Sequence, residues 1–194
     1  MSFFEKVLQL DRDLFFIINR KWSNSLFDLI LPYVRNAYIW IPFYLFLLIF
    51  IPLKYKKGGW FWLLLAVATA ASTDLVSSWL IKENIYRLRP CGDISLAGHI
   101  RFLLHYCPQS SSFTSSHAAN HFGFSVFFYL TLKSYYGNGV WFIFLWASII
   151  CYAQIYVGVH YPLDIIGGAI TGSVIGYIFS RIFNKYMRLE KVVL

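Results

Sequence analysis

The strongest constraint on this chain is a series of long apolar segments. Residues 37–53, 59–81, 117–132, 139–158 and 163–183 are built mostly of aliphatic and aromatic side chains. About twenty apolar residues cross the hydrocarbon core of a bilayer as an α-helix. The 194 residues are only 13% charged, whereas a soluble domain carries about 25% charged residues. The sequence therefore predicts an all-α fold, a polytopic membrane helix bundle with about five transmembrane helices.

The N-terminal segment has a different character. Residues 7–22 and 25–34 are short, amphipathic and charged, so we expect two helices lying at the membrane interface. A sixth span here would bury Asp11, Arg12 and Asp13, which is costly in hydrocarbon. Because no repeat, low-complexity tract or linker interrupts the sequence, we expect one membrane-embedded domain over the whole chain, with no cleavable signal peptide.

Basic residues give a prediction of orientation. Five spans place the chain ends on opposite sides, and Lys and Arg favour the cytoplasmic side. Eight lie on the side of the C-terminal tail and nine on the other, but Lys82 and Arg89 have a separate explanation given below. Setting those two aside favours a cytoplasmic C-terminus in a bacterial inner membrane. The net charge of +8 suits anionic lipid headgroups and implies no nucleic acid partner.

Residues 82–116 form the long connection, which this orientation places outside the cytoplasm. The segment holds Cys91 and Cys107. An oxidising compartment permits a disulfide between them, and two free thiols agree with the sequence equally well. In the fifth apolar segment, glycines recur every fourth residue, which predicts close packing against another helix. These are Gly168, Gly172 and Gly176.

Polar residues first gather at the end of the second apolar segment, in KENIYRLRP, residues 82–90. Lys82 and Arg89 are nearly two helical turns apart, so both face the same way if the helix reaches Arg89. Pro90 then ends the helix, and Arg87 points elsewhere. Taken alone, these cations are best explained as a positively charged collar at the membrane edge.

The second cluster, FTSSHAANH, residues 113–121, opens the third apolar segment. Ser and Thr are favoured as helix N-caps, and free backbone N–H groups at a helix start bind anions. His117 lies in the first turn, and His121 follows one turn later on the same face. A helix cap with interfacial histidines is an equally good interpretation of this stretch alone.

The third cluster is QIYVGVHYPLD, residues 154–164. Pro162 favours a helix start with Asp164 in the first turn and His160 just before it. An Asp beside a His holds the ring orientation and tautomer and stabilises the imidazolium. In isolation, a structural His–Asp pair is the better interpretation.

The predicted topology brings all three clusters to one membrane face. Cations with backbone donors suit a phosphate. A nucleophilic His with a second, acid–base His suits phosphoryl transfer through a covalent intermediate. The sequence has neither the Cys/His spacing of a metal site nor a carboxylate cluster, so we expect no metal and no cofactor.

These motifs resemble those of the type 2 phosphatidic acid phosphatase (PAP2) family of membrane lipid phosphatases. That family carries K-x6-R-P, P-S-G-H and S-R-x5-H-x3-D. Here the first reads K-ENIYRL-RP and matches fully. The second reads TSSH, with Thr114 for Pro and Ser116 for Gly. The third reads AQ-IYVGV-H-YPL-D, with Ala153 and Gln154 for Ser-Arg.

The resemblance implies a role for each matching residue. His160 attacks phosphorus and forms a phosphohistidine, Asp164 orients it, and His117 protonates the leaving group and then activates water. The phosphate oxygens are bound by Lys82, Arg89, Ser115 and the backbone at Ser116. The family needs no metal, which agrees with the absence of metal-ligand spacing.

Gln154 is the main departure from the family pattern. An Arg there would give a bidentate, permanently charged contact to phosphate, whereas Gln gives neutral hydrogen bonds. The loss is worth about 1.5–3 kcal/mol of transition-state stabilisation. Our hypothesis is that Gln154 still binds substrate while Arg87, Arg101 or His121 compensates for the missing charge.

The predicted function is metal-independent hydrolysis of a lipid phosphate or pyrophosphate at the extracytoplasmic face. Its partners are the lipid substrate and the bilayer. One alternative is phosphotransfer from one lipid to another, since an acceptor other than water can capture a phosphohistidine. Another is a non-catalytic protein that binds phospholipid headgroups, which Gln154 would favour. The retained His117, His160 and Asp164 favour an enzyme, because binding alone needs no nucleophile with an orienting partner.

Overall fold

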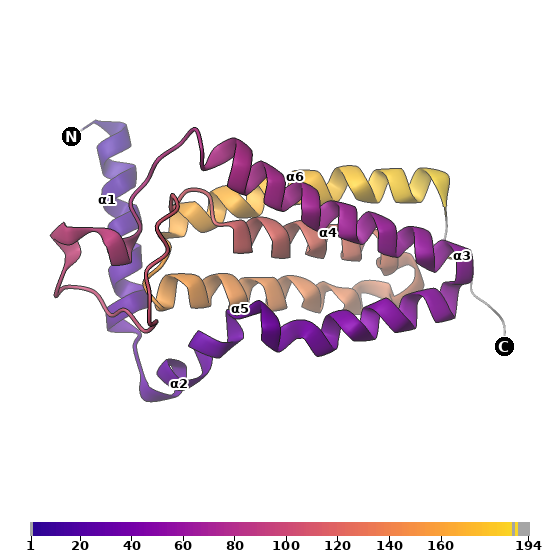
Figure 1. Ribbon diagram of the computed structural model, residues 1–194, viewed down its shortest axis with the longest axis horizontal. Coiled ribbons are helices and arrows are strands. Elements are labelled where there is room, and N and C mark those ends of the chain that lie inside the picture. Colours follow the sequence, from indigo (N-terminus) through magenta and orange to yellow (C-terminus); the bar gives the residue numbers. More distant parts are fainter. Residues whose placement is uncertain (1, 188, 190–194) are drawn as a thin grey trace.

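The computed structural model describes residues 2–187 and 189, and every regular element in this part of the chain is a helix. The principal helices are α1 (Phe3–Phe16), α2 (Ser25–Val34), α3 (Ile41–Asp74), α4 (Ser116–Tyr136), α5 (Phe142–Tyr156) and α6 (Pro162–Tyr186). Helices α3, α4, α5 and α6 run along the long axis, α1 crosses one end of them, and α2 lies at that same end (Figure 1). The predicted all-α class is confirmed.

Helix α3 is two antiparallel helices joined by a sharp reversal. Lys56 has φ 48° and ψ −125°, which no helix accommodates. Figure 1 shows α3 folding back on itself at the end of the bundle opposite α1. The two arms touch so closely that a Cβ on Gly59 would lie 2.3 Å from the carbonyl oxygen of Ile51. The reversal falls between the predicted apolar segments 37–53 and 59–81.

Within the described residues, three helical stretches are long and apolar enough to cross a membrane. They are Ala37–Ile81, Ser116–Tyr156 and Pro162–Tyr186. The first contains the Lys56 reversal, and the second contains both α4 and α5. Each of the five predicted apolar segments therefore lies on its own arm of the bundle.

Glycines join α4 to α6, as their spacing predicts. A Cβ would lie 2.4 Å from the Ser115 carbonyl oxygen if built on Gly168, and 2.0 Å from that of Ala119 if built on Gly172. Backbones this close leave no room for side chains. The seam holds the start of α4 against the start of α6, where two of the predicted site clusters lie.

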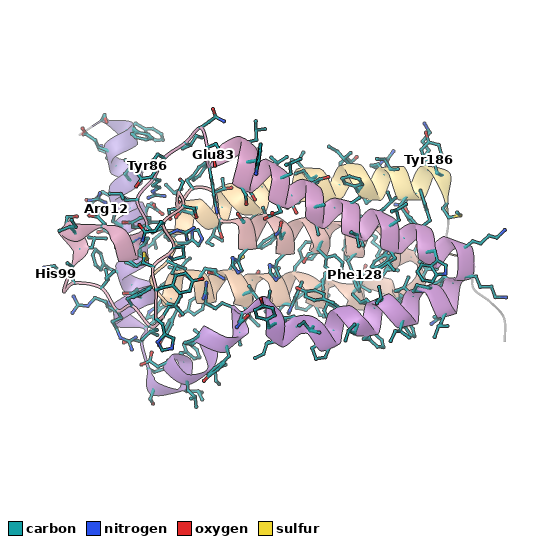
Figure 2. The ribbon with its side chains drawn as sticks, viewed as in Figure 1. Arg12, Glu83, Tyr86, His99, Phe128 and Tyr186 are labelled. Carbon is teal, nitrogen blue, oxygen red and sulfur yellow. A yellow bond between two sulfur atoms is a disulfide. The ribbon has the colours of Figure 1, made fainter. Side chains whose placement is uncertain are left out.

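Large aromatic side chains fill the middle of the bundle. Trp62, Phe127 and Phe183 are fully buried, and the Trp62 indole N–H donates to the Thr131 hydroxyl at 2.7 Å. In Figure 2, Phe128 lies midway along the helices, while Tyr186 and His99 mark opposite ends. The apolar middle and the polar end near His99 are therefore distinct parts of the molecule.

The polar end is assembled from the N-terminal segment and the 82–115 connection. Asn19 donates to the carbonyl oxygens of Arg101 and Tyr156, at 2.7 and 2.8 Å. Cys91 and Cys107 form a disulfide, which decides between the two alternatives left open by the sequence. These links attach the connection both to itself and to the bundle.

The two predicted N-terminal helices are present as α1 and α2, and the charged residues of α1 lie in different environments. Arg12 and Asp13 are exposed, whereas Asp11 is buried. The Asp11 carboxylate accepts from the Arg87 guanidinium at 2.5 Å and from the Leu163 backbone N–H at 2.8 Å. Burial is tolerated because a cation and a helix N-terminus compensate the charge.

Candidate active site

His160 is positioned by the tight turn between α5 and α6. Gly158 has φ 89°, a conformation that side chains other than Gly rarely adopt. A Cβ there would also lie 2.8 Å from the carbonyl oxygen of Arg101. The chain thus reverses within a few residues and places His160, which is buried, two residues before Pro162 in the first turn of α6.

The hydrogen bonds of His160 assign its tautomer. Nε2 lies 3.1 Å from Nη1 of Arg89, and because Arg only donates, Nε2 must accept. The ring proton is then on Nδ1, which lies 3.4 Å from Oδ2 of Asp164 and 3.4 Å from the Ser112 hydroxyl. Burial lowers the pKa of His160 to about 4. The ring is neutral near pH 7, with the Nε2 lone pair facing a cation.

Asp164 is fixed by donors on both of its oxygens. Oδ1 accepts from Arg87 at 2.6 Å, and Oδ2 accepts from the Ser112 hydroxyl at 2.5 Å and from the Tyr161 backbone N–H at 2.8 Å. The carboxylate is fully buried at the start of α6. It is held rigidly beside His160, as an orienting group requires.

The placement of Arg87 contradicts the expectation that it points elsewhere. The helix ends near Ile81, and residues 85–89 are irregular instead of continuing it. Arg89 precedes Pro90 and is extended, with φ −75° and ψ 152°, as pre-proline sterics favour. In an extended chain, alternate residues face the same side, so Arg87 and Arg89 both reach the site.

Arg89 reaches the site through a buried network of its own. It donates from Nε to the Ser110 carbonyl at 3.0 Å, from Nη1 to the Val159 carbonyl at 3.2 Å, and from Nη2 to the Ser110 hydroxyl at 3.1 Å. Burial lowers the pKa of Arg89, although Asp164 opposes the shift. The guanidinium has no carboxylate partner of its own among the residues described.

Lys82 lies where the helix after α3 ends. Burial, with repulsion from Arg89 as the next cause, lowers the pKa of Lys82 to about 8. The interaction with Arg89 places both cations in one electrostatic environment, as predicted. They converge through an extended segment and not along one helical face.

The start of α4 lies directly against that of α6. The Ser115 hydroxyl caps α4 by accepting from the Ala118 N–H at 3.4 Å, and the Ser115 N–H donates to the Asp164 carbonyl at 3.0 Å. Ser116 bonds to Ser78 through their hydroxyls at 3.0 Å. The helix N-terminus therefore opens beside the His160–Asp164 pair.

His117 occupies the first turn of this helix and is half-buried. Its imidazole lies close enough to His160, Lys82 and Arg35 for the charged forms of these groups to act on it. Its carbonyl accepts from Nδ1 of His121 at 2.7 Å. His117 and His160 thus belong to one site.

Gln154 is fully buried and is hydrogen-bonded to Arg35, a residue outside the three motif clusters. Its Oε1 accepts from Nε of Arg35 at 3.1 Å, while its Nε2 has no hydrogen-bond partner in the described structure. Arg35 follows the last residue of α2. Nothing in the local sequence pointed to it, because the contact joins positions 119 residues apart.

Arg87, Arg101 and His121, which we suggested could replace the family Arg, contact other groups. Arg87 pairs with Asp11 and Asp164, and Arg101 pairs with Asp28 on α2. The His121 ring packs 4.8 Å from that of Trp146 in an apolar setting. None of the three is therefore an unpaired cation, among the described residues, that could bind a phosphate.

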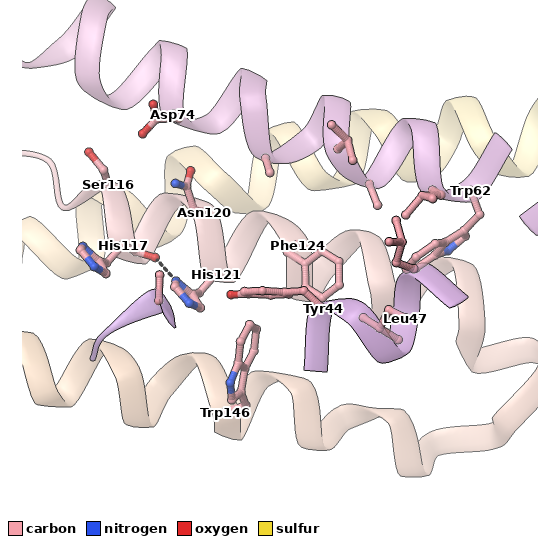
Figure 3. Close-up of a pocket in the computed structure, with 16 residues that line it drawn as sticks. Tyr44, Leu47, Trp62, Asp74, Ser116, His117, Asn120, His121, Phe124 and Trp146 are labelled. Carbon is pink, nitrogen blue, oxygen red and sulfur yellow. Dashed lines mark hydrogen bonds between the residues drawn. The ribbon is translucent and has the colours of Figure 1, made fainter. Parts of the chain in front are cut away.

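A cavity of about 500 Å³ lies beside the start of α4. Figure 3 shows His117, Ser116 and Asp74 at one end and Leu47 and Trp62 at the other. Of the candidate site residues, His117 and Ser116 line its polar end, and the rest of its lining is mostly apolar and comes largely from α3, α4 and α5.

A family model described as the PAP2 superfamily matches residues 59–188. The chain belongs to the PAP2 superfamily. The matched region includes all three motif clusters and the helices that carry them, so the resemblance inferred from the sequence is confirmed.

Several PAP2 relatives cover most of the chain. A lipid A 4'-phosphatase of Bacteroides thetaiotaomicron is 27% identical over 84% of this chain and 72% of its own. An undecaprenyl-diphosphatase of Sulfolobus acidocaldarius is 30% identical over 82% of this chain and 70% of its own. Both names describe phosphatases, the enzyme class predicted from the sequence.

Two solved structures are similar to the chain. Aquifex aeolicus LpxE is 26% identical with a TM-score of 0.63, covering 89% of this chain and 95% of its own. A transmembrane PAP2-type phosphatidylglycerolphosphate phosphatase of Bacillus subtilis has a TM-score of 0.72 at 20% identity, covering 95% and 90%. The second match shows the fold alone. With the apolar helices, these matches make the chain an integral membrane protein of the PAP2 superfamily.

Proposed function

We propose that this protein hydrolyses the phosphate or pyrophosphate end of a membrane lipid through a phosphohistidine on His160, without a metal. One observation carries the proposal. Nδ1 of His160 faces a fixed carboxylate, and its Nε2 lone pair faces the Arg89 guanidinium. A binding protein needs the cation but has no use for a neutral imidazole oriented by a buried Asp.

In the first step, Nε2 of His160 attacks phosphorus. The bond from phosphorus to the leaving oxygen breaks, and that oxygen takes its electron pair and a proton from His117. The imidazole becomes cationic, and its Nδ1–H lies toward Asp164, which stabilises the charge. Arg89 and Lys82 bind the phosphate oxygens, with the backbone at the start of α4, from Ser115 to Ser116.

In the second step, His117 takes a proton from water. The water oxygen attacks phosphorus, the phosphorus–nitrogen bond breaks, and Nε2 regains its lone pair. One group therefore acts as acid and then as base, the usual logic of a two-step displacement.

The cavity supports a lipid substrate. Its polar end is lined by the proposed acid His117 and by Ser116, and its walls farther in are apolar, including Leu47, Trp62 and Phe124. A hydrocarbon chain in the cavity would place its phosphate beside His117. The relatives act by name on lipid A and undecaprenyl diphosphate, so both headgroup classes belong in a substrate panel.

The orientation belongs to the same proposal. Each arm of α3, with α4, α5 and α6, crosses the membrane once, and the site faces outward with the C-terminus in the cytoplasm. The disulfide in the 82–116 connection suits an oxidising compartment. In a Cys91→Ser/Cys107→Ser background, an impermeant maleimide on whole cells should label Ser95→Cys but not Lys57→Cys. The opposite pattern would reverse the orientation.

The activity is tested with purified protein, a chelator, and a panel of lipid monophosphates and diphosphates. We expect phosphate release from at least one class and an acid-labile phosphoprotein that is absent in His160→Ala. Equal release by both proteins, or by neither, contradicts the proposal. Release of a phosphorylated lipid acceptor instead of free phosphate would indicate the phosphotransferase alternative.

A further inference from the structure

The buried and partly buried Lys and Arg residues at the polar end fall into two groups. Arg87 and Arg101 each pair with carboxylates. Lys82, Arg89 and Arg35 have no ion pair with any residue that the structure describes. Partly buried cations without counter-charges are costly, and three of them together define a place for an anion.

Arg35 belongs to this second group because its charge acts on Arg89 and on His117. Repulsion from Arg35 contributes to the lowered pKa of Arg89, after burial as the main cause. Arg35 also acts on the His117 imidazole, and burial lowers its own pKa. The guanidinium therefore lies within electrostatic reach of a phosphate-binding residue and of the proposed acid.

The contact with Gln154 determines which nitrogen atoms of Arg35 can donate to a ligand. Nε donates to Oε1 of Gln154 at 3.1 Å. Among the described residues, neither Nη1 nor Nη2 makes a hydrogen bond. Because Arg is a planar fork with five donors, fixing Nε leaves the Nη edge for a bidentate contact.

We propose that Arg35 is a phosphate-binding residue and that Gln154 positions it. Its guanidinium, carried by the N-terminal segment after α2, supplies the charge that the sequence lacks at position 154. This assignment rests on the proposed lipid phosphatase function. It makes the N-terminal segment part of the active site and gives Gln154 a role as acceptor for Arg35 instead of as a direct phosphate ligand.

The first test compares Arg35→Gln with Arg20→Gln. Arg20 is exposed on the same N-terminal segment, and its side chain makes no hydrogen bond to any residue that the structure describes. We expect Arg35→Gln to lower kcat/KM by about 10- to 100-fold, the worth of a bond to a charged group. The inhibition constants of orthovanadate and inorganic phosphate should rise in parallel, while Arg20→Gln matches the wild type.

A conservative variant covers loss of folding. Arg35→Lys keeps the charge and loses the fork, so we expect a rise of about 3- to 10-fold in the inhibition constant of phosphate. If Arg35→Gln has a lower melting temperature than wild type in detergent, the inhibition constant of Arg35→Lys becomes the test of the assignment. Inhibition constants for the Arg35 variants equal to that of Arg20→Gln would overturn the assignment.

The positioning role is tested at Gln154. Gln154→Leu removes the acceptor, whereas Gln154→Glu keeps it. We expect Gln154→Leu to weaken phosphate inhibition at an unchanged melting temperature, and Gln154→Glu to restore it at least in part. If phosphate inhibits Gln154→Leu as strongly as wild type, Gln154 does not position Arg35.

The two proposals fail differently. A wild-type protein that neither releases phosphate nor binds vanadate contradicts the phosphatase function itself. An active, vanadate-inhibited wild type with insensitive Arg35 variants contradicts the role of Arg35 alone.

Discussion

Residues 82–164 and residues 2–36 contribute to the same site in different ways. The first region carries the recognisable motifs and the groups that would react, His160, Asp164 and His117. The second has no motif, yet it supplies Asp11 against Arg87 and Arg35 against Gln154. The groups proposed to react come from the bundle, and α1 and α2 complete their charge environment.

The comparison of the two regions shows that the N-terminal region supplies part of the charge that balances Arg87. Arg87 pairs with Asp164 on one side and with Asp11 on the other. Asp11 thus balances a cation that would otherwise act on the His160–Asp164 pair alone. Substitutions in the motif region should therefore affect chemistry, and those in the N-terminal region should affect binding and stability.

The largest expected effect is at His160. His160→Ala removes the proposed nucleophile and should lower kcat by about 10⁴-fold or more, as loss of a covalent catalyst does. The melting temperature should change little by comparison. The measurement is steady-state phosphate release, with His99→Ala as a control because His99 is exposed on the 82–116 connection. A residual rate within about tenfold of wild type would contradict covalent catalysis.

Asp11 gives the next largest effect and tests the N-terminal region directly. Asp11→Asn keeps a group for the Leu163 N–H but leaves Arg87 with one carboxylate. Breaking a buried pair costs about 3–5 kcal/mol, so we expect a free energy of unfolding lower by about 3 kcal/mol. Denaturation in detergent measures it, beside Asp13→Asn, whose carboxylate is exposed. Equal stability of the two variants would show that α1 is only peripheral.

A pH profile separates the two kinds of cation. The folded-state pKa of Lys82 is lowered to about 8, so the ammonium loses its proton as pH rises through that value. The Arg35 guanidinium stays charged. We expect kcat/KM to fall above about pH 8, by up to tenfold per pH unit, and Lys82→Arg to extend the plateau. Identical profiles for both proteins up to pH 10 would exclude Lys82 as the titrating group.

The sequence predicted the local structure around the candidate site residues well because the motifs lie at helix starts. Ser115 caps α4 and Asp164 lies in the first turn of α6, as their patterns indicated. The glycine seam then brings those starts together. Local signals and one packing rule were sufficient to predict this part.

The remaining residues depend on contacts that no local pattern encodes. Arg87 was misplaced because the helix was extended to Arg89, although Pro90 favours an extended residue before it. Arg35 and Asp11 lie 119 and 76 residues from the groups they meet. A buried charge on an amphipathic helix looks the same in sequence as an exposed one until its partner is known.

The smallest expected effect is at Asp28, the carboxylate of α2. It pairs with Arg101 and accepts from the Tyr156 hydroxyl at 2.6 Å, which attaches α2 to the connection and to α5. The Tyr156 hydrogen bond, with Arg101, lowers the pKa of Asp28 below its ordinary value of 3.8. A lowered carboxyl pKa stabilises the fold above about pH 4, and this contribution is lost as pH falls through the folded-state value.

Because the Arg101–Asp28 pair is partly exposed, Asp28→Asn should cost only about 0.5–1 kcal/mol at pH 7. The difference from wild type should shrink below pH 4, and kcat/KM should change by less than about threefold. Denaturation at pH 7 and pH 3.5 measures both. If Asp28→Asn instead lowers kcat/KM as much as Arg35→Gln, then α2 positions Arg35 through this ion pair, and the N-terminal region controls catalysis through its docking as well as through its charge.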